Sequence, residues 1–191
     1  YKVITGYNYR NSFKKYNFNY QGLLNLSSLN FNTVQGWNLD SGFSFSKRNE
    51  EKGKVTSISS KFNYGFADDR LRVTGSFYHK FNNINDAYIY INGGNTVSQF
   101  NASEPISDFS NTVSTLFFKN NFMKLYQKEF VSLSLGKEVT NGIFLSGKFS
   151  FENRSSLQNT TDYTLLKSDK LYTSNNPLAP LDFIATPFEN Q

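Results

Sequence analysis

Hydrophobic and polar residues alternate one by one along several stretches of the chain. In residues 14–26, Tyr16 and Phe18 alternate with Asn17 and Asn19, and the alternation continues to Leu26. The same two-residue period returns in the ranges 37–47, 55–66, 71–81, 131–136 and 143–152. Successive side chains of a β-strand point to opposite faces, so the pattern predicts about six strands with one apolar and one polar face.

The lengths of these strands and of their connections suggest a membrane protein. Most of the alternating runs have about nine to twelve residues, which is enough for a tilted strand to cross a bilayer. Tight turns at 67–70 and 140–142 alternate with longer polar linkers at 48–54, 82–127 and 154–191. Outer-membrane barrels combine short periplasmic turns with long external loops. We therefore expect an all-β fold, a partial transmembrane antiparallel β-barrel with long external loops.

One linker, 82–127, is expected to be an insert that lies outside the cell or covers the lumen. The whole chain, 1–191, would otherwise be one section of an outer-membrane barrel. Within the insert, residues 87–91 predict a short strand that ends at 92–95, where the sequence reads Asn-Gly-Gly-Asn. Apolar residues at helical spacing predict a short helix over 112–128, with a strand that extends beyond the membrane as the alternative.

Composition supports an amphipathic sheet and excludes other classes. The chain has 20 Phe, 12 Tyr and one Trp but a mean hydropathy of −0.52. No apolar run is long enough for a transmembrane helix. The net charge of +5 is spread over mixed signs, so nucleic-acid binding is not expected. With no cysteine and one histidine, neither a metal site nor a cofactor is expected.

Charged residues recur at polar positions of the predicted strands. These lumen-facing candidates are Asp40, Lys61, Arg72, Lys80, Lys148 and Glu152, with Glu138 at an equivalent position. In an open barrel they would bias the passage of ions, and in a plugged barrel they would form an internal network of ion pairs. Their mixed signs favour the internal network.

Residues that often carry catalysis have structural explanations here. His79 shares the apolar positions with Phe77 and Phe81, as expected for an aromatic girdle at a membrane interface. Asp68 and Asp69 lie in a tight turn beside Arg70, where turn chemistry explains them. Glu138 and Glu152 would lie more than about 20 Å apart at 3.3 Å per residue, too far for a two-carboxylate mechanism. We therefore expect a protein that is not an enzyme.

Several stretches resemble a known family. They are residues 31–36 (FNTVQG), 99–101 (QFN), 124–126 (KLY) with Lys128 and Phe130, 141–142 (NG) and 157–163 (LQNTTDY). They resemble the DUF5686 family, outer-membrane proteins of Bacteroidota of unknown function. The resemblance implies a large barrel, commonly preceded by a carboxypeptidase-regulatory-like domain, and it implies no catalytic residues. Because the chain begins directly in strand-like sequence, we expect it to be an excerpt of a longer protein.

These observations predict an outer-membrane scaffold, channel or assembly component. The expected location is the bacterial outer membrane. The expected partners are outer-membrane lipid and other outer-membrane proteins in a complex, with no nucleic acid. Two alternatives remain open at this point: a section of a TonB-dependent nutrient transporter, and a soluble β-sandwich module for adhesion or binding.

Overall fold

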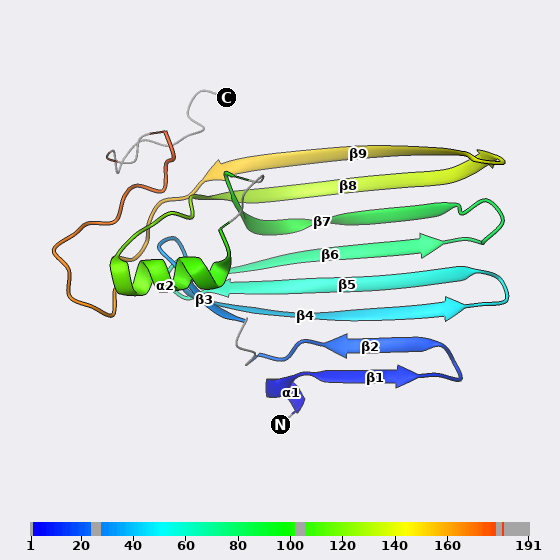
Figure 1. The fold of residues 1–191 in the computed structure, drawn as a ribbon, viewed down its shortest axis with the longest axis horizontal. Coiled ribbons are helices and arrows are strands. Elements are labelled where there is room, and N and C mark those ends of the chain that lie inside the picture. Colours follow the sequence, from blue (N-terminus) through cyan, green and yellow to red (C-terminus); the bar gives the residue numbers. More distant parts are fainter. Residues whose placement is uncertain (1, 24–27, 102–105, 179–180, 182–191) are drawn as a thin grey trace.

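One antiparallel sheet contains all strands of the described residues, which are 2–23, 28–101, 106–178 and 181 in this computed structural model. Neighbouring strands follow the order β1-β2-β4-β5-β6-β7-β8-β9, and β3 pairs with one end of β4 (Figure 1). The strands are β1 (Tyr7–Asn11), β2 (Tyr16–Tyr20), β3 (Leu29–Asn32), β4 (Gly36–Asn49), β5 (Lys54–Gly65), β6 (Arg70–Lys80), β7 (Tyr88–Gln99), β8 (Leu125–Thr140) and β9 (Ile143–Ser156). Two helices, α1 (Lys2–Thr5) and α2 (Asp108–Phe118), accompany them. The all-β antiparallel fold is confirmed, and the sheet is not closed within the described residues.

The two faces of this sheet differ in chemistry. Ile58 lies opposite Phe45 on one side and Phe77 on the other, and Leu133 lies between Ile91 and Phe149 in the same way. We call this the apolar face. On the opposite face, Ser59 lies between Ser44 and Ser76, and we call it the polar face. The predicted alternation is therefore correct along the central strands.

The apolar face is not packed against a second layer. Its side chains are exposed to an unusual degree, with Phe149 at 70% and Phe151 at 71%. The only hydrophobic core cluster among the described residues consists of Val34, Met123 and Leu125, next to the loops. Among the described residues, buried polar side chains outnumber buried hydrophobic ones. The apolar face of this sheet is thus open, and the buried side chains of the fold are mainly polar.

The connections define two ends of the sheet. The β1–β2, β4–β5, β6–β7 and β8–β9 connections lie together at what we call the hairpin end (Figure 1). The β5–β6 turn and the β7–β8 connection, which contains α2, lie at the other end, which we call the cap end. The predicted strict alternation of short turns and long loops is therefore wrong. The turns at 67–70 and 140–142 lie at opposite ends because β7 adds a strand between them.

The difference from the predicted pattern of turns and loops arises within residues 82–127, which do not form a single insert. The strand predicted over 87–91 continues through Gly93 and Gly94 to Gln99 and pairs with β8 along its whole length. Gly94 has φ +133, and a Cβ there would collide with the carbonyl oxygen of Val73. Asn95 Oδ1 accepts a hydrogen bond from the backbone N–H of Val73 at 2.6 Å. Gly94 thus lets β7 approach β6 closely, and Gly93 likewise lies close to the carbonyl of Phe130 in β8, so the Gly-Gly pair does not form a turn.

The predicted helix over 112–128 is confirmed in part. It begins at Asp108, after the N-cap Ser107, whose hydroxyl accepts from the N–H of Ser110. It ends before Lys119, which adopts a left-handed conformation with φ 50. Residues from Leu125 onward belong to β8, so the second half of the predicted helix was wrong.

Candidate functional site

The six predicted charged positions share the polar face of the sheet. Asp40 lies opposite Asn63, and Asn63 lies opposite Arg72. Lys61 lies opposite Gly42 and Thr74, which are on the same face. The cross-strand register also places Lys80, Lys148 and Glu152 on this face. Their common face is thus established, while their orientation toward a lumen remains a prediction.

Three of the six form ion pairs with residues that the sequence did not indicate. Arg72 pairs with Asp68 at 2.5 Å, and Lys80 pairs with Asp86 at 2.6 Å. Glu152 accepts from Lys128 at 2.7 Å and from Arg154 at 2.5 Å. In the described part of the chain, neither Lys61 nor Lys148 has an ion pair. The charges therefore form separate local pairs and not one continuous network.

The pair between Arg72 and Asp68 is the most deeply buried. The Arg72 side chain is 1% exposed and the Asp68 side chain 7%. Arg72 also donates from Nε to Oε1 of Gln127 at 2.8 Å. This cluster connects the β5–β6 turn, through Arg72 in β6, to the beginning of β8. The sequence suggested Arg70 as the neighbour of the acidic turn, but the ion pair is made by Arg72.

A chain of amide side chains connects a turn to Asp40. In the turn between β3 and β4, Asn32 Oδ1 accepts from the backbone N–H of Gln35 at 2.7 Å. Gln35 Nε2 donates to Asn63 Oδ1 at 2.5 Å, and Asn63 Nδ2 donates to Asp40 Oδ1 at 2.9 Å. These bonds fix the orientation of each amide and satisfy one carboxylate oxygen of Asp40.

A cavity of about 220 Å³ lies beside this chain of amides. Asp40, Asn63 and Gln35 line one wall, and Gln99 and Asp108 line another. Burial raises the pKa of Asp108, and the nearby charge of Asp40 raises it further. The cavity therefore offers carboxylate and amide groups that can hydrogen-bond water or a small polar solute.

The cap end is closed over by α2 and the segment that follows β9, residues 157–176, which together we call the cap. Backbone hydrogen bonds join Thr160 N–H to the carbonyl of Thr33 and Leu165 N–H to the carbonyl of Leu116, each at 2.9 Å. The Tyr172 hydroxyl donates to the carbonyl of Thr115 at 2.9 Å. Burial raises the pKa of Tyr172 to about 12, which keeps this hydroxyl protonated.

Asn175 and Lys124 attach the end of the cap to the start of β8. Asn175 Oδ1 accepts from the N–H of Leu125 at 2.8 Å, and its Nδ2 donates to the carbonyl of Leu125 at 2.5 Å. Lys124 Nζ donates to Thr173 Oγ1 and to the carbonyl of Ser174, both at 2.6 Å. Burial lowers the pKa of Lys124 to about 8. The cap is thus an ordered part of the fold, held mainly by polar contacts.

His79 and the two glutamates occupy the positions in the sheet that the alternation predicted. His79 is on the apolar face, edge-on to Phe81 at 4.7 Å between ring centroids, and Nδ1 hydrogen-bonds Thr56 Oγ1 at 2.9 Å. Glu138 and Glu152 lie opposite Phe144 and Phe130, so they are eight positions apart along the strands, or about 26 Å. Their predicted separation is confirmed.

The fold defines an all-β protein with one apolar, exposed face and one polar, capped face. The family described as "Family of unknown function (DUF5686) C-terminal domain" matches the chain over residues 1–191. The chain belongs to this family, and the predicted resemblance is confirmed. No curated protein and no solved structure matches the chain. Within the described residues, none of the helices has the length and apolar character needed to span a membrane.

The sequence did not identify the cap and the amide chain as a unit. A signal was nevertheless present, because stretches that carried the family resemblance meet at the cap end. Thr33 in the stretch 31–36 contacts Asn159 and Thr160 in the stretch 157–163. The N–H of Phe100, in the stretch 99–101, donates to the carbonyl of Lys124 at 3.0 Å. These stretches are distant in sequence, and only the fold brings them together.

Proposed function

We propose that the sheet is part of the wall of an outer-membrane β-barrel whose polar interior is closed at the cap end. In this role the protein is a scaffold or assembly component of the outer membrane and not an open channel. The observation that carries the proposal is the exposed apolar face, which continues from β2 to β9. Apolar surface left in water costs about 25 cal/mol per Å², so a face of this extent requires lipid or a second protein layer.

Strand length favours lipid over a second sheet. The strands from β4 to β9 have 11 to 16 residues, which meets the about 9–11 residues that a tilted strand needs to cross a bilayer. Strands of a soluble sandwich are usually about five or six residues long and cover each other's apolar faces. The exposed edges of β1 and β9 would pair with further strands of the complete barrel, because open edges do not occur within the hydrocarbon region.

The cap supports a closed interior. Hydrogen bonds join its segment 157–176 to α2, and they also join this segment to the β3–β4 turn and to the start of β8. An open channel would need a continuous aqueous path at this end, and in the proposed barrel the hydrogen-bonded cap would obstruct such a path. In this proposal the separate ion pairs on the polar face serve a structural role.

The orientation of the two faces can be tested with single cysteines, since the natural sequence has none. Leu133 and Ser134 are neighbours in β8 and lie on the apolar and polar faces, respectively. A spin label at Leu133→Cys should collide readily with oxygen, which concentrates in lipid, and poorly with a water-soluble nickel chelate. Ser134→Cys is the matched control and should show the opposite preference. Equal access of the nickel chelate to both labels in vesicles would contradict the proposal.

The two ends of the sheet should lie on opposite sides of the membrane. Outer-membrane barrels place short turns in the periplasm, which assigns the hairpin end to that side. A membrane-impermeant maleimide should therefore label Phe109→Cys, in the 74% exposed position of α2, on intact cells. It should label Asn141→Cys, in the β8–β9 turn, only after permeabilisation. Asp69→Cys should behave like Phe109→Cys, because both lie at the cap end. Labelling of Asn141→Cys alone on intact cells would invert this topology.

A further inference from the structure

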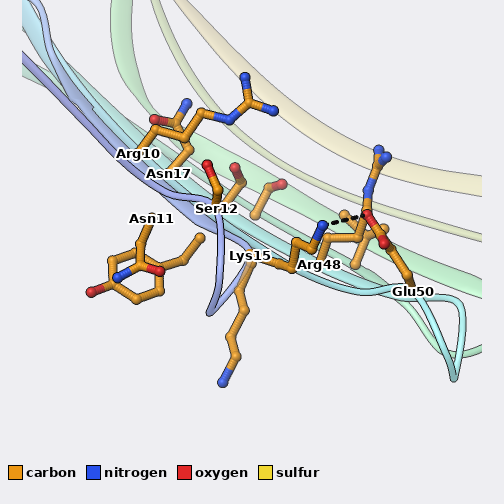
Figure 2. A pocket seen from close by; sticks show the side chains of 12 residues that line it. Arg10, Asn11, Ser12, Lys15, Asn17, Arg48 and Glu50 are labelled. Atoms are coloured by element: carbon orange, nitrogen blue, oxygen red, sulfur yellow. Dashed lines mark ion pairs between the residues drawn. The ribbon is translucent and has the colours of Figure 1, made fainter.

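A basic pocket of about 420 Å³ lies at the hairpin end, opposite the cap. It is formed by the β1–β2 hairpin and the parts of β4 and β5 beside it (Figure 2). Three cationic side chains line it, namely Arg10, Lys15 and Arg48, against a single carboxylate, Glu50. Lys47 also borders the pocket, but its position in β4 places its side chain on the opposite, apolar face. Lys15 Nζ lies 3.4 Å from Glu50 Oε1, and both side chains are largely exposed, so this ion pair is weak. The pocket therefore retains an excess of positive charge.

The register of the strands arranges hydrogen-bonding groups in a row across the pocket. Arg10 lies opposite Asn17, Asn17 opposite Ser46, and Ser46 opposite Ser57. Arg48 follows two positions after Ser46 on β4 and therefore points to the same, polar face. The floor of the pocket is thus formed by the guanidinium of Arg10, the amide of Asn17 and the hydroxyls of Ser46 and Ser57. The guanidinium of Arg48 lies beside them.

Two observations indicate that these groups are available for a ligand. Neither Arg10 nor Arg48 has an ion pair within the described part of the chain. The side-chain Oδ1 of Asn17 is buried and has no hydrogen-bond partner among the described residues. Amide oxygen and nitrogen are assigned from their surroundings, so rotation of this amide would place Nδ2, a donor, at the position of this unpartnered atom.

We propose that this pocket binds a phosphate group. Guanidinium groups bind phosphate oxygens through paired, charge-assisted hydrogen bonds, and the serine hydroxyls can donate to the remaining oxygens. The volume admits a phosphate together with a small attached group. The phosphate belongs either to a water-soluble anion at the mouth of the barrel or to an anionic lipid headgroup that reaches the edge strand β1. The binding chemistry is the same for both sources, whereas the placement of the pocket at the mouth of a barrel rests on the proposed function.

The test uses the complete protein in nanodiscs of phosphatidylcholine and titrates inorganic phosphate at constant ionic strength, with chloride as the balancing anion. Saturable binding that excess chloride does not reproduce is the expected result. Arg48→Gln should weaken phosphate binding about tenfold or more. Arg48→Lys, which keeps the charge but loses the paired hydrogen bonds of the guanidinium, should weaken binding less. The matched control is Lys52→Gln, an exposed cation in the same β4–β5 turn outside the pocket, which should bind as the unchanged protein does.

Nanodiscs that contain phosphatidylglycerol distinguish the two sources. If the phosphate comes from lipid, phosphatidylglycerol should raise the apparent dissociation constant for inorganic phosphate, and Arg48→Gln should abolish this competition. If it comes from a soluble anion, the lipid composition should leave the constant unchanged. Either result supports the site. Absence of saturable phosphate binding in both membranes, or equal weakening by Arg48→Gln and Lys52→Gln, would overturn it. The face-labelling experiment at Leu133 and Ser134 remains independent of this outcome.

Discussion

Phe149→Arg should lower the free energy of unfolding of the protein in lipid vesicles by about 2–4 kcal/mol, the cost of an arginine at the lipid-facing midplane of a barrel. Phe149 lies in the middle of β9 (Ile143–Ser156) and pairs with Leu133 on the apolar face. Its side chain is 70% exposed, so within the described residues the substitution removes little protein packing. The expected loss therefore reports on the medium around the face. It can be measured by urea titration of the protein refolded into vesicles.

Ser150→Arg is the matched control for this measurement. Ser150 is the next residue of the same strand, is also exposed, and lies opposite Ser132 on the polar face. An arginine there remains among polar and charged groups, so its effect should stay within about 0.5 kcal/mol, as for ordinary surface substitutions. If both arginines cost the same small amount, the apolar face is not in contact with lipid. A soluble, folded monomer obtained without detergent would contradict the proposal directly.

The central strands could be predicted from sequence because the face on which a residue lies depends only on whether its position in the strand is odd or even. Phe43, Phe62, Phe77 and Phe149 occupy apolar positions of the alternating stretches 37–47, 55–66, 71–81 and 143–152, and they share one face of the sheet. A local period of two is sufficient for this inference, since it requires no knowledge of which strands are neighbours. The hairpins at 67–70 and 140–142 followed from their turn residues for the same local reason.

The prediction failed where a local signal had two meanings. Gly93 and Gly94 indicated the end of a strand, but here they permit the close approach of β7 to its two neighbours, β8 and β6, inside the sheet. Because of that single error, the prediction omitted half of β7 and placed the turns at 67–70 and 140–142 at the same end of the sheet. The first alternating stretch, 14–26, likewise extended beyond β2, which ends at Tyr20, since residues 21–23 are not in a strand and residues 24–26 lie outside the described residues. Alternation indicates faces reliably, but it does not determine where the chain reverses.

The cap and the amide chain were beyond prediction for a different reason. Their hydrogen bonds join residues that are far apart in sequence, such as Thr33 and Asn159, which are 126 positions apart. Asn and Thr are common throughout the chain, so composition does not indicate which of them are bonded. The basic pocket at the hairpin end could not be predicted for a similar reason, because it depends on the pairing of β2 with β4 and not on β4 alone. Such sites become visible only when the strand order is known.

The second large effect is expected at the buried ion pair between Arg72 and Asp68. Arg72→Met should lower the free energy of unfolding by about 3–5 kcal/mol, because it leaves the Asp68 carboxylate buried without its partner. The Asp68 side chain is only 7% exposed, so water can replace the guanidinium only in part. Gln127 Oε1 loses its donor as well. Urea titration of the protein in vesicles measures the change, and Lys61→Met is the matched control, since Lys61 is an exposed cation on the same face.

A double-mutant cycle separates the ion pair from simple loss of packing. If the penalty arises from the unpaired carboxylate, adding Asp68→Asn to Arg72→Met should restore much of the lost stability, because it removes the buried charge. If the arginine acts mainly by filling space beneath the β5–β6 turn, the second substitution should restore nothing and the two losses should add. A cost for Arg72→Met as small as that of Lys61→Met would contradict the assignment. The ion pair would then be incidental, and the link between the turn and β8 would depend on other contacts.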